Sequence, residues 1–284
     1  MQTVVITGAS TGIGRATAGY LAHQGWRVFA GVRKENDAKA LGNDHENITA
    51  LRLDVTDEQS ISAAMETVSN ALQGETLCGL VNNAGIAFMG PLALQPMSEI
   101  EAHFRVNILG AIAVTQAFAP LLGMDRTRTG APGRIINISS AGGLIAGPFV
   151  GAYTATKHAL EGATDTFRRE LMIYGIDAIV VGPGAVKTPI WEKADEKNEA
   201  RRYASSEWAG SLDAYADTLM QAGEDGFSPE KIAHVIETAL TDPRPKARYA
   251  PVPNKLTNFT IPTRLPKRWL DGIFASRFGM KKPA

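Results

Sequence analysis

The chain has 284 residues, of which 44% are hydrophobic and 20% are charged, and its formal net charge is zero. This length suits one α/β domain rather than two, and the balanced charge gives no electrostatic reason to expect nucleic acid as a partner. The single cysteine, Cys78, excludes an intrachain disulfide. Neither a signal peptide nor an apolar run long enough to span a membrane is recognisable, so we expect a soluble, cytoplasmic protein.

Short apolar runs alternate with longer amphipathic segments, which is the pattern of βα units around a parallel sheet. The runs are rich in Val and Ile, as is typical of strands covered on both faces. We therefore predict a single-domain, doubly wound α/β fold with about seven strands in the order 3-2-1-4-5-6-7. The predicted strands are 3–7, 27–31, 48–53, 77–81, 134–138, 177–181 and 248–250.

Capping signals mark several helix starts. Thr56 and Ser98 each open a four-residue pattern that fits a capping box. Ser228 is followed by a proline, which places a cap and a first-turn proline in the favoured positions. The predicted helices are 12–24, a segment from 56, 98–122, 151–174 and a segment from 228.

The first predicted strand runs into a glycine-rich turn that opens a helix. Glycine lets the backbone turn tightly and lets a diphosphate approach the helix N-terminus, where free N–H groups and the helix dipole attract anions. The spacing is G-x-x-x-G-x-G rather than G-x-G-x-x-G, and a plain strand-to-helix turn is the alternative. The candidate dinucleotide-binding residues of this turn are Gly8, Ser10, Thr11, Gly12, Ile13 and Gly14.

The ends of the next two strands bear on the choice of dinucleotide. An NAD-preferring site offers a carboxylate to the ribose 2′-hydroxyl about 20 residues beyond the turn. Here the chain has Arg33 and Lys34, and a guanidinium can fork onto a 2′-phosphate, which favours NADP(H). A solvated loop charge is the alternative, and Glu35 and Asp37 leave NAD(H) open. Asp54 either accepts a hydrogen bond from the adenine amino group or caps the following turn.

Tyr153 and Lys157 are four residues apart on a predicted helix and therefore share one face. A lysine ammonium beside a phenol favours the phenolate, so we expect the pKa of Tyr153 to fall from its reference near 10 towards neutrality. Tyr153 would then serve as an acid–base for an alcohol proton. Ser140 follows the fifth predicted strand, where its hydroxyl can hydrogen-bond the substrate oxygen.

Several motifs stand in register across roughly residues 3–190: the glycine turn, Asn82-Asn83-Ala84-Gly85, Asn107, Ser140, Tyr153-x-x-x-Lys157 and Pro183-Gly184. Together they resemble the short-chain dehydrogenase/reductase family. The chain is also loosely similar to the branch that includes retinol, hydroxysteroid and hydroxybutyrate dehydrogenases, which suggests a lipophilic secondary alcohol, ketone or aldehyde.

The resemblance implies an oxidoreductase that moves a hydride between a nicotinamide ring and an alcohol or carbonyl carbon. Tyr153 would be the general acid–base, Lys157 would bind the nicotinamide ribose and Ser140 would orient the substrate oxygen. Asn107 would hold a relay water, or would simply bond the backbone as a polar helix residue. The resemblance adds Val55, Asn83, Ala84, Gly85, Pro183, Gly184, Val186 and Thr188 to the cofactor-binding set.

The resemblance also implies a homodimer or homotetramer formed through two long helices, a small-molecule partner and no metal. A catalytically silent dinucleotide-binding regulatory or scaffold protein is the rival interpretation. Loss of Ser140, Tyr153 or Lys157 would favour that interpretation, and all three residues are present.

Two stretches interrupt the alternation of strands and helices. The insertion 187–226 should lie beyond the carboxyl ends of the strands, as a lid over the substrate, or its aromatic residues pack a small core of their own. The extension 251–284 mixes aromatic and basic residues. It either touches a membrane surface or, as is more common, packs on its own domain or on a sister subunit. The candidate substrate contacts in the insertion are Trp191, Tyr203 and Trp208, with Tyr215 and Met220 beside them.

Overall fold

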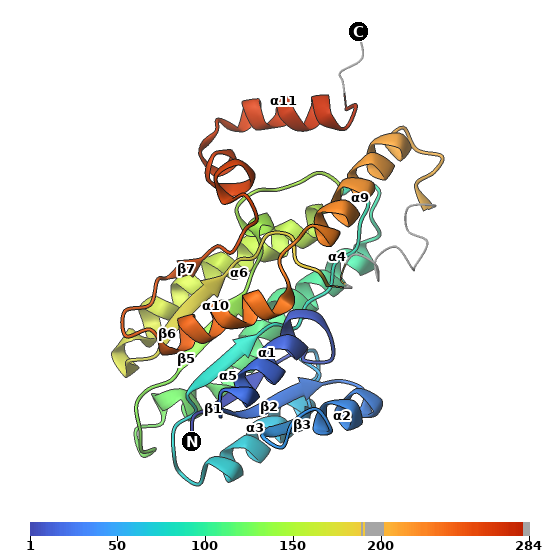
Figure 1. Cartoon of the computed structure of the whole chain (residues 1–284). Coiled ribbons are helices and arrows are strands. Elements are labelled where there is room, and N and C mark those ends of the chain that lie inside the picture. Colours follow the sequence, from blue (N-terminus) through green and yellow to red (C-terminus); the bar gives the residue numbers. More distant parts are fainter. Residues whose placement is uncertain (189, 191–201, 281–284) are drawn as a thin grey trace.

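Seven parallel strands form one sheet in the order β3-β2-β1-β4-β5-β6-β7 in the computed structural model, which describes residues 1–188, 190 and 202–280 (Figure 1). The predicted order and the single doubly wound domain are confirmed. Winding reverses between β1 and β4, and such a switch point opens a crevice at the carboxyl ends of the strands. The strands are β1 (Thr3–Ile6), β2 (Arg27–Val32), β3 (Ile48–Arg52), β4 (Gly79–Asn82), β5 (Arg134–Ile138), β6 (Asp177–Val181) and β7 (Arg248–Tyr249).

Helices cover both faces of this sheet (Figure 1). The α-helices that the structure describes are α1 (Gly12–His23), α2 (Glu35–Gly42), α3 (Glu58–Leu72), α4 (Met97–Phe104), α5 (Ala111–Phe118), α6 (Gly151–Glu170), α9 (Ala209–Glu224), α10 (Pro229–Thr241) and α11 (Lys267–Arg277). Of these, α9 and α11 lie beyond the sheet (Figure 1). Side chains alternate along a strand, so Val4 and Ile6 pack under α1, α2 and α10. Val5, between them, packs under α3 and α5. The five inner strands are therefore buried on both faces, as their Val and Ile content predicted, whereas the edge strands β3 and β7 are partly exposed.

The predicted cap of α10 is confirmed, and that of α3 is wrong by one residue. Ser228 accepts a hydrogen bond from the backbone N–H of Lys231 at 3.4 Å. Asp57, rather than Thr56, caps α3, because its carboxylate accepts from the N–H of Gln59 at 3.0 Å. A carboxylate and a hydroxyl are comparable caps, so the sequence pattern alone did not distinguish the two positions.

The predicted helix 98–122 is interrupted near its middle by a π-helical segment. The run begins with α4 at Met97, preceded by Pro96, so Ser98 lies inside the first turn and does not cap it. The segment Arg105–Gly110 is π-helical and leads into α5. A Cβ on Gly110 would lie 2.7 Å from a Val55 methyl, so the helix passes very close to the end of β3. π-Helical turns of this kind often mark functional sites.

The insertion and the extension meet in an aromatic cluster. The ring of Tyr215 in α9 lies 5.9 Å from that of Phe149 and 5.0 Å from that of Phe278, between ring centroids. The extension therefore packs on its own domain, although Trp269 and Ile273 on the other side of α11 are 69% and 50% exposed. Within the part of the chain that the structure describes, no helix combines the length and apolarity needed to cross a membrane.

A buried histidine near the end of α4 joins this helix to the loop after β4. His103 is fully buried; its Nδ1 bonds the carbonyl oxygen of Glu99 at 2.8 Å, and its Nε2 accepts from the N–H of Phe88 at 3.0 Å. This arrangement requires the neutral ring with its proton on Nδ1. Burial lowers the pKa of His103 below its ordinary value of 6.5, and the Glu99 carbonyl and carboxylate oppose this shift.

We predict that this histidine makes the fold sensitive to mild acid. Below pH 6.5 the histidine is protonated in the unfolded chain but is still neutral in the folded protein. The free energy of unfolding therefore falls as the pH decreases from 6.5 towards the lower pKa of the folded state. Urea unfolding between about pH 7.5 and 5 would measure the slope. His103→Gln can retain both hydrogen bonds without titrating and should show a shallower slope; equal slopes would contradict the prediction.

Candidate active site

A cavity of about 930 Å³ lies at the carboxyl ends of the central strands and brings many of the predicted site residues together. Its walls come from the start of α1, the turn after β4, the end of β5, α6, the loop after β6, α9 and the C-terminal extension. Segments far apart in sequence therefore converge on one volume large enough for a cofactor or substrate. The predicted residues that line it are Ile13, Asn83, Gly85, Ser140, Tyr153, Lys157, Pro183, Gly184, Val186 and Thr188.

Glycine lets the turn before α1 pack directly against the turn after β4. Gly8 and Gly12 have φ of +66° and +57°, in the left-handed region that favours glycine. A Cβ on Gly8 would lie 2.7 Å from the Cα of Ala84, in the turn after β4. The Asn83 amide donates to the carbonyl oxygens of Thr7 and Gly8 at 2.9 and 3.0 Å. Asn83 thus joins the two turns, and α1 starts directly behind them without a side-chain cap on its N–H groups.

Ser140 and Tyr153 lie close together in the lining of the cavity, since a Cβ on Gly142 would lie 3.4 Å from Ser140 Oγ and 3.7 Å from Tyr153 Cε1. The Ser140 hydroxyl accepts from the N–H of Gly142 at 3.0 Å, which holds it at the end of β5. Tyr153, near the start of α6, is only 8% exposed. Burial raises the pKa of Tyr153 above its ordinary value of 10, and the hydrogen bond with Ser140 opposes that shift.

Lys157 lies one turn further along α6, and its ammonium is also buried. Its Nζ donates to the carbonyl oxygen of Ile138 at 2.8 Å and lies 5.7 Å from the centroid of the Tyr153 ring. Burial lowers the pKa of Lys157 to about 8, while the Glu161 carboxylate acts in the opposite direction. The expected fall in the pKa of Tyr153 is therefore wrong for this structure, because burial disfavours the phenolate and the lysine ammonium is bonded to the backbone instead.

Asn107 occupies the π-helical segment and bonds a neighbouring loop. Its side-chain oxygen accepts from the N–H of Ile86 at 2.8 Å, and its amide donates to the Ile86 carbonyl at 2.9 Å and to the Thr156 hydroxyl at 3.1 Å. A Cβ on Gly85 would lie 3.5 Å from the Asn107 oxygen and 3.7 Å from Lys157 Nζ. These contacts place Asn107 beside the lysine; its role with a relay water stays a prediction.

The residues predicted to contact the adenosine end lie outside the cavity. Arg33 is exposed at the end of β2 and forms no ion pair with any residue that the structure describes. Asp54 takes the turn-capping role, since Oδ1 accepts from the N–H and hydroxyl of Thr56 at 2.9 and 2.7 Å. The alternative role of Asp54, a hydrogen bond with the adenine amino group, stays a prediction. The remaining predicted positions outside the cavity lining are Gly8, Ser10, Thr11, Gly12, Gly14, Val55, Ala84 and Asn107.

The substrate side of the cavity is built mostly from residues that the sequence did not identify. Tyr203 and Trp208 are absent from the lining among the described residues, although Tyr203 packs in the same aromatic cluster as Tyr153. Trp191 lies outside the described residues. Of the insertion's aromatic residues, Tyr215 reaches the cavity, because α9 turns this face inward. The side chains that accompany Tyr215 are Ile145, Val150, Ile190, Leu219, Val252 and Phe274.

Comparisons with known proteins agree with this geometry. The sequence profile of the family described as short chain dehydrogenase matches residues 2–199. An NADPH-dependent 3-dehydrocapnine reductase from Ornithobacterium rhinotracheale is 36% identical over 276 residues, which cover 96% of each chain. The 17-beta-hydroxysteroid dehydrogenase type 6 of Bos taurus is 36% identical over 87% of this chain and 79% of that one. A short-chain dehydrogenase structure from Streptomyces avermitilis has a TM-score of 0.75 and 25% identity, covering 97% of this chain and 94% of that one.

Two alanine substitutions in α1 test the close packing of the glycine turn. A methyl group on Gly14 would clash with the Asn83 amide and the Gly8 carbonyl, whereas one on Gly19 meets nothing within 4 Å. Gly14→Ala should destabilise the fold by ~1–3 kcal/mol through overpacking. Gly19→Ala should stabilise it by ~0.5–1 kcal/mol through helix propensity. Urea unfolding measures both changes, and equal effects would show that the turn is not tightly packed.

Proposed function

Because the chain belongs to the short-chain dehydrogenase family and is an NAD(P)-dependent oxidoreductase acting on CH–OH or C=O groups, we propose that it reduces a lipophilic ketone or aldehyde with Tyr153 as proton donor. One observation carries this proposal: Ser140, Tyr153 and Lys157 line the same cavity, and the serine hydroxyl lies close enough to the phenol to influence its pKa. A carbonyl oxygen bound between the two hydroxyls would contact both side chains.

The proton step follows from the protonation states that burial favours. A raised pKa keeps the Tyr153 phenol protonated at neutral pH, which is the form that donates to a developing alkoxide. Ser140 orients the same oxygen and stabilises its charge through a second hydrogen bond. Lys157, with a pKa of about 8, remains largely an ammonium at neutral pH, and in that form it can donate a hydrogen bond to the nicotinamide ribose.

The residues around the cavity suit a dinucleotide, and such a cofactor supplies the hydride for carbonyl reduction when bound. The accessible backbone at Gly8 and Gly12, followed by the N-terminus of α1, provides the groups that bind a diphosphate. Asn83 and Gly85 border the cavity near Lys157, where a nicotinamide ribose would be held. Pro183, Gly184, Val186 and Thr188 also line the cavity and would cover the nicotinamide.

The proposed cofactor preference is NADP(H), with NAD(H) as the alternative. Arg33 is exposed at the end of β2, beside Lys34, which is the N-cap of α2. Glu35, the nearest carboxylate, is paired with Lys39 at 3.1 Å. The relative from Ornithobacterium rhinotracheale is named as NADPH-dependent, which agrees with this preference.

The lipophilic character of the substrate rests on the inner surface of the cavity. Tyr215, Leu219 and Phe274 present apolar surface near the reactive side chains. They belong to the insertion 187–226 and the extension 251–284, which we propose form a cover over the substrate. One relative is named for a hydroxysteroid, a lipophilic secondary alcohol. We further propose a homodimer or homotetramer through the α4–α5 run, which exposes Met97, Phe104 and Leu109.

Removal of one oxygen atom tests the role of Tyr153. Tyr153→Phe should lower kcat for carbonyl reduction by about 10²–10⁴-fold, the usual contribution of general acid catalysis, without weakening dinucleotide binding. A panel of ketones and aldehydes of increasing chain length, with NADPH oxidation as the readout, gives the rates. Tyr174→Phe, at the far end of the same helical run, is the matched control. Wild-type rates in Tyr153→Phe would refute the assignment.

A second experiment tests the cofactor preference. NADP⁺ should raise the thermal unfolding midpoint more than NAD⁺ at equal concentration, because the tighter ligand stabilises more. Arg33→Ser should weaken NADP⁺ binding by about 10–100-fold, the loss expected for a charge-assisted contact, and leave NAD⁺ binding unchanged. Lys39→Gln removes a nearby exposed positive charge and should change neither. A larger shift with NAD⁺ would overturn the role of Arg33.

A further inference from the structure

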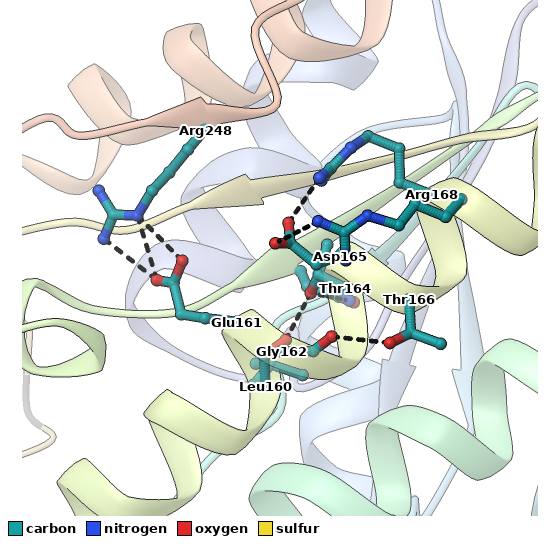
Figure 2. Close-up of polar contacts among 10 residues, drawn as sticks. Leu160, Glu161, Gly162, Thr164, Asp165, Thr166, Arg168 and Arg248 are labelled. Atoms are coloured by element: carbon teal, nitrogen blue, oxygen red, sulfur yellow. Dashed lines mark hydrogen bonds and ion pairs between the residues drawn. The ribbon is translucent and has the colours of Figure 1, made fainter.

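An ion pair that the proposed reaction does not use lies directly behind Ser140. Arg248, the first residue of β7, directs Nε at both oxygens of Glu161 at 3.0 and 3.2 Å, and its Nη2 lies 3.1 Å from Oε1 (Figure 2). The two side chains are only 20% and 14% exposed. Partial burial and a forked geometry distinguish this pair from the exposed ion pairs of the surface, which contribute little to stability.

The same guanidinium reaches the backbone of the active site. Arg248 Nη2 donates to the carbonyl oxygen of Ser140 at 3.2 Å. That carbonyl belongs to the peptide group linking Ser140 to Ala141, whose N–H donates in turn to the Pro183 carbonyl at 2.6 Å. The Ser140 carbonyl also accepts from the N–H of Gly143 at 3.0 Å. Both polar groups of this peptide are therefore held: the carbonyl by Arg248 and Gly143, and the N–H by the loop after β6.

The surrounding backbone is shaped to admit the pair. A Cβ on Gly182, directly after β6, would collide with Arg248 Nη2, and a Cβ on Gly143 would lie 2.8 Å from a Glu161 oxygen. The outer face of the guanidinium lies 5.0 Å from the centroid of the Phe259 ring, in the C-terminal extension. Two glycines and one aromatic ring thus leave the guanidinium little freedom to move away from Ser140.

We propose that Arg248, held in place by Glu161, is a positioning residue for Ser140 that fixes the Ser140–Ala141 peptide and thereby aims the serine hydroxyl at Tyr153 and the substrate oxygen. This inference rests on the proposed role of Ser140 in catalysis. Neither side chain of the pair lines the cavity, so the pair acts through the backbone rather than on the substrate. Glu161 also follows Lys157 by one helical turn on the same face of α6. The ion pair therefore lies beside the helix that carries both Tyr153 and Lys157.

A spectroscopic experiment tests the contact without any turnover. The sequence contains two Ser–Ala peptides, Ser140–Ala141 and Ser62–Ala63. With ¹³C on the serine carbonyl and ¹⁵N on alanine, a correlation spectrum through the peptide bond shows only these two. Arg248→Lys retains a charge for Glu161 but loses the fork, so it should move the Ser140 carbonyl signal. The Ser62 signal, from an exposed turn of α3, should stay in place.

The chain offers a matched control on the same helix. Arg168 pairs with Asp165 at 2.6 Å on α6 (Figure 2) and makes no contact with Ser140. Arg168→Lys should leave both carbonyl signals and the kinetics unchanged. Arg248→Lys should lower kcat by about tenfold to a hundredfold, as expected for a misplaced catalytic group, with the KM for the dinucleotide unchanged. If the ion pair only stabilises the fold, Arg248→Lys should lower the thermal unfolding midpoint without lowering kcat at an unchanged KM.

The results distinguish the positioning role of Arg248 from the proposed catalytic function. An unmoved Ser140 signal in Arg248→Lys, or a moved signal with unchanged kcat, would overturn the positioning role. A wild-type protein that turns over no carbonyl would refute the proposed function, and the contact would then be judged on the carbonyl signal alone. If Arg248→Lys does not fold, Glu161→Gln provides the same test, because it loosens the guanidinium while leaving Arg248 itself intact.

Discussion

The burial of a phenol and an ammonium on one turn of α6 is the constraint on which the site depends. Neither side chain is stable as a charge in an apolar interior unless it is paired or hydrogen-bonded. Burial therefore acts on both in the direction of neutrality: it raises the pKa of Tyr153 and lowers that of Lys157 to about 8. The Ser140 hydroxyl opposes the effect of burial on the pKa of the phenol. The Ile138 carbonyl accepts a hydrogen bond from the buried ammonium. A protonated phenol beside an ammonium suits donation of a proton to a substrate oxygen.

A buried polar ladder keeps these side chains in register. The Asn82 amide at the end of β4 donates to the Asn137 oxygen on β5 at 2.8 Å. The Asn137 amide donates to the Thr164 hydroxyl on α6, also at 2.8 Å. Side chains of this kind are costly to bury unless they are bonded, and here they tie two strands to the helix that carries Tyr153 and Lys157. Slippage of α6 along β5 would break the ladder, so the separation of Ser140 and Tyr153 is set by tertiary contacts beneath the cavity.

The sequence predicted those parts of the protein that local rules govern. The bounds of β5 and β6 were predicted correctly, because each begins with a charged residue, continues mainly with β-branched residues and is followed by a small residue, Ser139 or Gly182. The glycine turn and the Tyr153–Lys157 pair were recognisable because their chemistry depends on fixed spacing. The shift of the tyrosine pKa was predicted in the wrong direction, since spacing shows that two groups share a face but not how deeply they are buried. The π-helical segment around Asn107 was missed because no residue there breaks the helical pattern.

What the sequence did not reveal depends on pairs of residues that are distant along the chain. Arg248 and Glu161 are 87 positions apart, and β7, which carries the arginine, has only two residues. No periodicity or motif links an arginine on a short edge strand to a carboxylate in the middle of a helix. The same applies to Phe274 of the extension, which lines the cavity and stacks on Phe278, whose ring in turn packs on Tyr215 of α9. Groups that act on a substrate need local order and leave a sequence pattern. The groups that hold them need only a neighbour in space, and only the folded structure identifies that neighbour.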